Sequence, residues 1–508
     1  MPSEPVLTQT AAGDGNRERE TGSLRGRVLG GIGWNLATQV VNQATRVAVG
    51  VLLARLLSPH EFGIAGMALI FSGFAVVFTD LSLGAALIQR RTIDELDRST
   101  VFWTTLAIGI AFTGLGIGLS GTVASFFGEP QAKPLVAVLA VSFTLSSLGA
   151  TQQALLTREL AYRSLQLREM AALTAGSIAG VVLAVAGYGP WAIVVQSVVY
   201  GAASVVLLWL LSSWRPRPIY SLESLRSLGG FGIKLFGSRL LAYANLNADN
   251  LLVGRVLGAA ALGTYGLAYN TMFTPMLRIG LPIQQVVAPA FSRMQDDTSR
   301  LWTAWTRSKR LSAALLAPAF LAILVTAPDL VPVVFGAKWR HAVPVLQFLC
   351  CAGVAHVLVT LNWSVLQARG RAGTLLRLNL LVSAVTVGAF VVGLRWGVAG
   401  VAGSYAVAKW VLVLPDTWIT CRAIGARTLE TLHCSAAAIP SAVAAAIVGY
   451  GARVALAGAG APPELRLALV LATGFAAYVT LIALLAPALV EEVRQLVKRG
   501  AVAPAAAA

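Results

Sequence analysis

Residues 31–57 read GIGWNLATQVVNQATRVAVGVLLARLL, an apolar stretch that polar side chains interrupt at regular intervals. A membrane-spanning helix needs about 20 predominantly apolar residues, so this stretch is long enough to cross a bilayer. Its polar residues recur every three or four positions and therefore share one face of a helix. A helix that faced only lipid would lack this stripe, whereas a helix that lines a watery cavity could use it. The stripe consists of Asn35, Gln39, Asn42 and Arg46.

The whole chain has the composition of a membrane protein. Of its 508 residues, 56% are hydrophobic and 12% are charged, whereas soluble proteins carry about 25% charged residues. The net charge of +17 would suggest nucleic acid in a soluble protein. Here the basic residues separate apolar segments, so we expect no nucleic-acid partner. Residues 1–29 lack the apolar core of a cleavable signal peptide, and we expect the first span to act as an uncleaved anchor.

The apolar segments predict an all-α polytopic membrane protein with about fourteen transmembrane helices. We expect a cytoplasmic N-terminal segment (1–29), an N-terminal lobe of helices 1 to 6 (30–212) and a cytoplasmic linker (213–228). A C-terminal lobe of helices 7 to 12 (229–420), helices 13 and 14 (421–488) and a cytoplasmic tail (489–508) would follow. The spans lie near 31–57, 62–88, 101–123, 134–156, 169–188, 190–212, 229–257, 262–290, 312–335, 342–366, 374–394, 397–420, 432–452 and 467–488.

The basic residues between the spans predict the orientation in the membrane. Most of the 39 lysines and arginines precede the first span or lie in every second connection. The positive-inside rule makes that side cytoplasmic, and the even number of spans places both termini there. The most basic connection, 292–311, interleaves two tryptophans with arginine and lysine. We interpret it, like residues 157–169, as an amphipathic segment at the lipid headgroups, since single-stranded nucleic acid is the less fitting alternative next to a span.

The chain nearly repeats itself after about 200 residues, because LLARLLSPHEFGIAGMALI (52–70) aligns with LVGRVLGAAALGTYGLAYN (252–270). The offset covers an even number of predicted spans, so both copies enter the membrane in the same direction. This arrangement predicts pseudo-symmetric halves around an axis along the membrane normal, with a binding site at their interface. The identical pairs are Leu52/Leu252, Arg55/Arg255, Leu57/Leu257, Gly63/Gly263, Gly66/Gly266 and Ala68/Ala268.

Charged residues inside the spans are the candidate functional groups, because such charges are costly and usually serve a function. We expect a cationic, water-filled cavity that holds an anionic head group. Asp80 and Asp249 would either neutralise the arginines or take part in ion coupling. The predicted cationic residues are Arg46, Lys234, Arg239 and Arg278, and the predicted polar residues are Asn35, Gln39, Asn42, Asn245 and Asn270.

Signatures of catalysis and cofactor binding are missing from the sequence. No phosphate loop for ATP is present, and no GxSxG nucleophile motif. The pattern Gly116-x-Gly118-x-x-Gly121 lies inside a span and is better explained by close helix packing. The cysteines and histidines form no metal-binding spacing, so we predict neither a catalytic residue nor a metal or other cofactor.

Four stretches resemble the polysaccharide transporter (Wzx-type oligosaccharide flippase) family, a branch of the multidrug/oligosaccharidyl-lipid/polysaccharide exporter superfamily. The resemblance covers about residues 30–420 and is most specific at GVLLARLLSPHEFGIAGMALIF (50–71), ALLTRELAYRSLQLREMAA (154–172), LLVGRVLGAAALGTYGLAYN (251–270) and LVPVVFGAKWRHAVPVLQFLC (330–350).

The resemblance implies two six-helix lobes around a central cavity that work by alternating access. It further implies that an undecaprenyl-diphosphate-linked oligosaccharide moves from the cytoplasmic to the outer leaflet of a bacterial plasma membrane. The partners would be this lipid-linked oligosaccharide, membrane lipids, and a polysaccharide polymerase or export machinery. A multidrug or organic-cation antiporter of the same superfamily is the alternative, although it should favour buried carboxylates over arginines. A membrane enzyme of the same pathway fits less well, because no long external loop is predicted.

Overall fold

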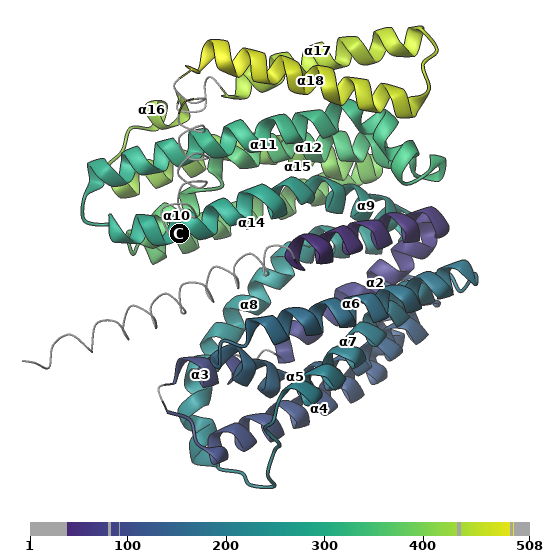
Figure 1. The fold of residues 1–508 in the computed structure, drawn as a ribbon, viewed down its shortest axis with the longest axis vertical. Helices are drawn as coiled ribbons and strands as arrows, with labels where there is room; N and C mark the ends of the chain where they lie inside the picture. The colour runs from purple at the N-terminus through teal and green to yellow at the C-terminus, as the bar shows by residue number, and fades with distance from the viewer. Residues whose placement is uncertain (1–37, 80–82, 91, 434–437, 488–490, 492–508) are drawn as a thin grey trace, which may run out of the picture. The chain divides into compact units, whose positions relative to one another are not determined.

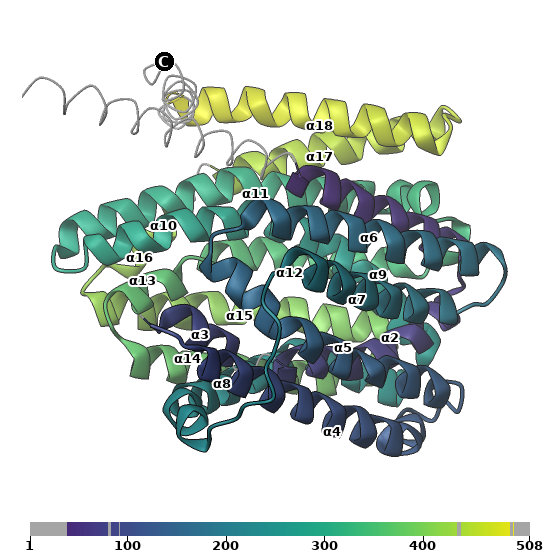
Figure 2. The same cartoon turned by 60° about the horizontal axis from the view of Figure 1, so that its bottom comes forward.

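The computed structural model of the chain describes residues 38–79, 83–90, 92–433, 438–487 and 491, with the backbone alone described at 74–79, 85, 89, 227–242 and 244. These described residues are almost entirely helical and contain no strand (Figures 1 and 2). Nine of their helical stretches are long and apolar enough to cross a membrane. The predicted all-α membrane architecture is therefore confirmed, while the predicted count of fourteen spans is not.

The described helices fall into two compact units, which we describe separately. The first unit contains the helix at residues 38–56, α3 (Leu83–Gln89), α6 (Tyr162–Val185) and α7 (Trp191–Leu211). It also contains most of α4 (Glu95–Phe127) and α5 (Ala132–Arg158), the end of α2 (Pro59–Thr79), and α8 (Leu222–Leu257) up to Tyr243.

Small residues on α6 allow α7 to pack closely against it in the first unit. A Cβ added at Gly176 would lie 2.7 Å from the carbonyl oxygen of Gln196, and one at Gly180 would lie 3.1 Å from that of Ala192. Membrane helices commonly pack in this way, because lipid gives no hydrophobic drive for two apolar helices to associate. The close packing fixes the positions of the polar side chains that α6 and α7 carry.

The second unit contains the beginning of α2 up to Ile70, residues Thr122–Ala132, the end of α8, and the remainder of the chain. Its longest helix, α11, packs against α12, α17 and α18, and both views show α17 and α18 side by side (Figures 1 and 2). Its further helices are α9 (Ala259–Pro275), a π-helical turn (Met276–Gly280), α10 (Leu281–Arg293), α11 (Thr298–Val334), α12 (Ala342–Val359), α13 (Asn362–Ala368), α14 (Ala372–Gly393), α15 (Gly397–Ile424), α16 (Thr428–His433), α17 (Ala438–Gly458) and α18 (Pro463–Leu485).

The two copies of the internal repeat meet each other within the second unit. A Cβ added at Gly63 of α2 would overlap the carbonyl oxygen of Ala259, and one at Gly263 of α9 would overlap that of Pro59. Each contact is the counterpart of the other after a shift of about 200 residues, as expected at a pseudo-two-fold axis. The repeat found in the sequence therefore corresponds to a reciprocal crossing of two helices, and glycine is needed at its centre.

One face of the segment 292–311, which the sequence predicts to lie at the lipid headgroups, packs against protein. Its second half forms the first turns of α11, where Leu301 and Trp305 are fully buried in a core with Leu361, Val365 and other residues of α13 and α15. Lys309 is also buried, and its Nζ lies 4.9 Å from the ring centre of Trp305. This core was not predicted, because an amphipathic pattern does not distinguish a helix face that meets headgroups from one that meets protein.

Candidate functional site

Arg46, one of the two arginines of the first predicted span, forms an ion pair in the first unit. Residues 38–56 are helical as predicted, with Gln39 exposed and Asn42 buried. Arg46 Nη2 donates to Glu169 Oε1 at 2.5 Å, and the two side chains are 49% and 21% exposed. Asn35 lies outside the described residues. One residue of the predicted polar stripe, Arg46, therefore pairs with an acidic residue on α6, Glu169, that the sequence interpretation did not select.

The Glu169 carboxylate accepts hydrogen bonds from three different side chains. Its Oε1 faces Arg46, while its Oε2 accepts from Tyr200 Oη at 2.8 Å and from Arg168 Nη2 at 3.1 Å. Arg168 is held in turn by Gln153 Oε1 at 3.2 Å and Ser204 Oγ at 3.1 Å. Two guanidinium groups and a phenol that converge on one carboxylate form an arrangement that suits oxyanions in general, including phosphate.

Arg168, Glu169 and Tyr200 of this cluster line a cavity of about 620 Å³ within the first unit. The cavity wall is formed by α3, α5, α6 and α7, and its apolar part includes Leu145 and Leu208. Its polar part comprises Ser146, Gln153, Thr157, Arg168, Glu169, Tyr200 and Ser204. Arg46 contacts the other carboxylate oxygen of Glu169, Oε1. The arrangement combines cationic and hydroxyl or amide donors, which are the groups that recognise phosphates and sugars.

A second, smaller polar cavity of about 160 Å³ lies within the second unit. It is lined by Asn245 and Asp249 of α8, Tyr269 of α9, and residues of α14 and α15 that include Thr386 and Lys409. The Lys409 Nζ lies 5.2 Å from the ring centre of Tyr405. The cavity therefore brings the predicted Asn245 and Asp249 together with a lysine.

Asp249 is buried and makes hydrogen bonds to neutral donors. Its Oδ2 accepts from Tyr265 Oη at 2.9 Å, and its Oδ1 accepts from the backbone N–H of Asn250 at 2.8 Å. Only 3% of the residue is exposed. Among the described residues these neutral donors are bonded to Asp249 in place of the arginine that one of the two sequence-based roles required. A buried carboxylate without a cationic partner at bonding distance is a group whose charge state can matter for function.

Arg278 and Asn270 are exposed residues on either side of a change in helix type. Pro275 ends α9, and Met276–Gly280 continues as a π-helical turn that contains Arg278. Proline removes a backbone donor and displaces the preceding turn, which explains the local change in hydrogen bonding. Single π-helical turns within α-helices frequently occur at functional sites.

Three further predicted residues have no described side chains. Lys234 and Arg239 lie on α8, where the structure describes the helical backbone alone, and Asp80 lies outside the described residues. The backbone does show that α8 begins at Leu222, before the expected start of the seventh span.

The structure also reveals a buried charged network that the sequence interpretation missed. Lys309 Nζ on α11 donates to Asn362 Oδ1 of α13 at 3.3 Å, and Asn362 Nδ2 donates to Asp416 Oδ1 of α15 at 2.6 Å. Lys309 belongs to the segment 292–311 that the sequence predicts at the lipid headgroups, and Asp416 lies near the end of the predicted span 397–420. A basic and an acidic residue in apolar surroundings were the available signal, whereas Asn362 gave none.

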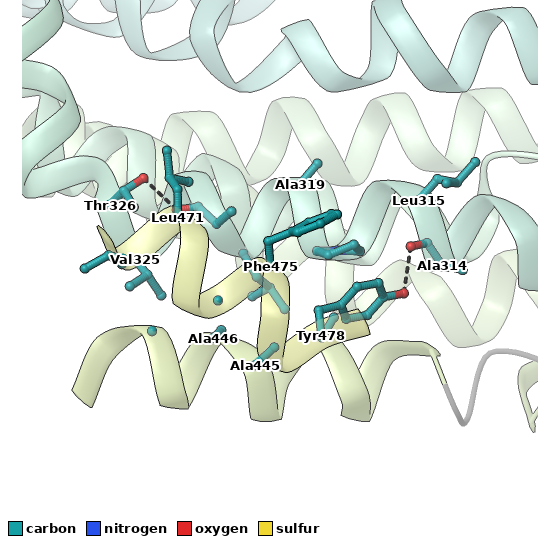
Figure 3. A pocket seen from close by; sticks show the side chains of 17 residues that line it. Ala314, Leu315, Ala319, Val325, Thr326, Ala445, Ala446, Leu471, Phe475 and Tyr478 are labelled. Atoms are coloured by element: carbon teal, nitrogen blue, oxygen red, sulfur yellow. Dashed lines mark hydrogen bonds between the residues drawn. The ribbon is translucent and has the colours of Figure 1, made fainter. Parts of the chain in front are cut away.

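An apolar cavity of about 420 Å³ lies between α11, α17 and α18 (Figure 3). Its lining combines small residues such as Ala445 and Ala446 of α17 with larger ones such as Leu471 and Phe475 of α18. Tyr478 Oη donates to the carbonyl oxygen of Ala314 at 2.7 Å, which fastens α18 to α11 at one side of the cavity.

Comparison with known proteins gives a consistent family. The family described as "Polysaccharide biosynthesis protein" matches residues 52–344. The Escherichia coli (strain K12) lipopolysaccharide biosynthesis protein WzxC is 28% identical over 73% of this chain and 76% of its own. The Bacillus subtilis (strain 168) teichuronic acid biosynthesis protein TuaB is 27% identical over 91% and 96%, respectively. The Rhizobium meliloti (strain 1021) succinoglycan biosynthesis transport protein ExoT is 26% identical over 82% and 85%.

Two solved structures show the same fold at low sequence identity. The lipid II flippase MurJ, in an inward closed conformation, has a TM-score of 0.73 and 14% identity over 90% of this chain and 99% of its own. A multidrug resistance transporter of the MATE family, in an inward-facing conformation, has a TM-score of 0.58 and 15% identity over 77% and 96%. The described helices therefore have the fold of a membrane transporter.

Proposed function

Because this chain belongs to the polysaccharide biosynthesis protein family, within the Wzx-type branch of the exporter superfamily, we propose that it flips a lipid-linked oligosaccharide across the membrane. The chain is a multi-pass bacterial membrane protein of a transporter family. The proposed substrate is an undecaprenyl-diphosphate-linked oligosaccharide, moved from the cytoplasmic to the outer leaflet by alternating access for surface polysaccharide synthesis.

The observation that carries the proposal is the convergence of Arg46, Arg168 and Tyr200 on one carboxylate beside a 620 Å³ cavity. A diphosphate must leave water to cross the membrane, and an unpaired charge in an apolar medium is very costly. Guanidinium groups can pair with phosphate through two hydrogen bonds while keeping their own charge. Gln153, Ser204 and neighbouring polar groups suit sugar hydroxyls, and the prenyl chain would remain in lipid.

The remaining predicted residues enter the proposal with their sequence-based roles. Arg278, Lys234 and Arg239 would contribute positive charge, and Asn35, Gln39, Asn42, Asn245 and Asn270 would contribute hydrogen bonds. Asp249, with Asp80 as a second candidate, would serve ion coupling. The burial of Asp249 beside the small cavity that also contains Lys409 supports that role, because the free energy of a buried charge depends strongly on proton or ion occupancy.

The direct test measures the distribution of lipid-linked oligosaccharide between the two leaflets in cells with and without this protein. Loss of the protein should confine the oligosaccharide to the cytoplasmic leaflet, detected as protection from an enzyme or lectin added outside. Restoring the gene should restore accessibility. An unchanged distribution would refute the proposed function.

Single replacements of arginine test the cationic site more narrowly. Arg46→Gln, Arg239→Gln and Arg278→Gln should each lower translocation, by about tenfold if one charge-assisted interaction worth about 1.4 kcal/mol is lost at the limiting step. Arg427→Gln is a matched control, because Arg427 is 82% exposed and its ion pair is with Glu430, three residues away. Full activity of all three variants would show that the mechanism does not use these cations.

A further inference from the structure

Glu169 is an acid in the middle of the anion-binding groups that the proposed function requires. Its carboxylate has three donors within 3.1 Å, two of them guanidinium groups. It also lines the cavity together with Arg168, so it lies where an oxyanion that entered this cavity would meet that arginine. A substrate phosphate and the Glu169 carboxylate therefore need the same donors.

We propose that the Glu169 carboxylate is an internal stand-in for the substrate phosphate, which it matches in charge and hydrogen-bonding capacity. It occupies Arg46 and Arg168 when no substrate is bound, and a diphosphate displaces it. This inference rests on the proposed function and adds to it a residue that sets the affinity threshold for the substrate.

The exposure of the partners supports displacement of Glu169 over a purely structural role. Arg168 is 10% exposed and is fixed by Gln153 and Ser204, so it would stay in place when Glu169 leaves. Arg46 is 49% exposed, and Glu169 is its only acidic partner among the described residues. Arg168 is therefore fixed at the cavity wall, whereas the Arg46 side chain is accessible.

A competing internal anion raises the intrinsic affinity that a substrate must have in order to bind. Glu169 is tethered at the site, so it competes at a high effective concentration whatever the substrate concentration is. Because each lipid must displace the same carboxylate, Glu169 should weaken the binding of prenyl diphosphate and prenyl monophosphate by the same factor. The diphosphate offers additional oxygens and negative charge, so it is the lipid that overcomes this threshold.

The test measures the affinity of the full-length protein in nanodiscs for undecaprenyl diphosphate and undecaprenyl monophosphate. Glu169→Gln removes the charge but keeps an oxygen for Tyr200. We expect this variant to bind both lipids more tightly than the unmodified protein does, each by about tenfold, because the same competitor is removed for both. Glu159→Gln is the matched control, because Glu159 is an exposed acid ten residues earlier, and it should change neither affinity.

A double variant separates competition from a general change in charge. In the Arg46→Gln background, Glu169→Gln should give a much smaller gain in affinity, because one of the contested donors is already absent. An equal gain in both backgrounds, or no gain in either, would overturn the proposal.

A measurement on the unmodified protein avoids the question of whether a variant folds. Carbodiimide with an amine nucleophile labels accessible carboxyl groups, and mass spectrometry locates the label. Adding undecaprenyl diphosphate should increase labelling of Glu169 while labelling of Glu159 stays constant. If the protein binds the diphosphate but labelling of Glu169 is unchanged or reduced, the displacement of Glu169 is refuted and the proposed function is not. A protein that binds no diphosphate at all would refute the proposed function as well.

Discussion

Asp329 neutralises two arginines that come from two other helices of the second unit. Its Oδ2 accepts from Arg453 of α17 at 2.6 Å, and its Oδ1 accepts from Arg466 of α18 at 2.7 Å. Asp329 is 2% exposed and each arginine is 21% exposed. One carboxylate thus connects α11 to both helices of the C-terminal hairpin, and Tyr478 adds the neutral contact described above.

Replacing Asp329 by asparagine should destabilise the docking of this hairpin. The variant leaves two largely buried guanidinium groups without their counter-charge, and breaking a buried ion pair costs roughly 3–5 kcal/mol. We expect a clear decrease in the midpoint of thermal unfolding of the detergent-purified protein. Asp296→Asn is the matched control, since Asp296 is exposed. If both variants unfolded at the same temperature, the ion pairs would contribute little to docking.

Sequence patterns do not predict ion pairs of this kind. Arg46 and Glu169 are separated by 123 positions, and Arg466 and Asp329 by 137. Periodicity assigned Arg46 to the polar face of its helix, but it contains no information about which distant side chain lies opposite. Glu169 did carry one signal, since it is the only acidic residue between Glu159 and Glu223.

At the scale of elements, the crossing of α2 and α9 depends on glycine at two equivalent positions. Gly63 and Gly263 face backbone carbonyl oxygens at distances that exclude a Cβ. Gly66 and Gly266 come one turn later in each helix and are identical in the repeat as well, yet they have room. The nearest atom to a Cβ at Gly66 would be Leu262 Cδ2 at 3.7 Å, and none lies within 4 Å at Gly266.

Alanine should therefore be tolerated at one pair of positions and rejected at the other. Gly63→Ala or Gly263→Ala would force two backbones apart, and overpacking of this kind typically costs about 1–3 kcal/mol or more. Gly66→Ala and Gly266→Ala should fold normally and serve as controls. Fluorescence-detected size-exclusion chromatography of tagged protein would compare the amounts of monodisperse material. Similar yields from all four variants would contradict the crossing geometry.

Most helices could be predicted because a spanning helix is a local property of the chain. The expected spans near 134–156, 190–212 and 374–394 correspond to α5, α7 and α14, with ends that differ by a few residues. The π-helical turn at Arg278 was not predicted, although Pro275 and Pro282 mark the place where regular hydrogen bonding is interrupted. The core around Trp305 was missed because its composition equals that of a helix lying at the membrane surface.

At the scale of the whole molecule, the internal repeat explains why charge accumulates in the first span and in α8. The repeat makes these helices equivalent, and both carry polar residues at helical spacing: Arg46 follows Asn42, and Asp249 follows Asn245. In the structure Arg46 pairs with Glu169, which lines the larger polar cavity of the first unit, and Asp249 lines the smaller polar cavity of the second unit. One cavity is rich in cationic donors and the other contains a buried acid, so duplication of one element has provided two sites with different chemistry.

The basic connections between the predicted spans predict the orientation of the whole chain in the membrane. Lysine and arginine resist translocation, so the side with the basic connections should remain cytoplasmic, together with both termini. Green fluorescent protein fused to the C-terminus should fluoresce, because it folds in the cytoplasm, and alkaline phosphatase fused there should be inactive. Alkaline phosphatase fused after Gly460, in the connection between α17 and α18, should be active and controls for expression. Active phosphatase at the C-terminus with inactive phosphatase after Gly460 would reverse the orientation, and with it the direction of transport that we propose.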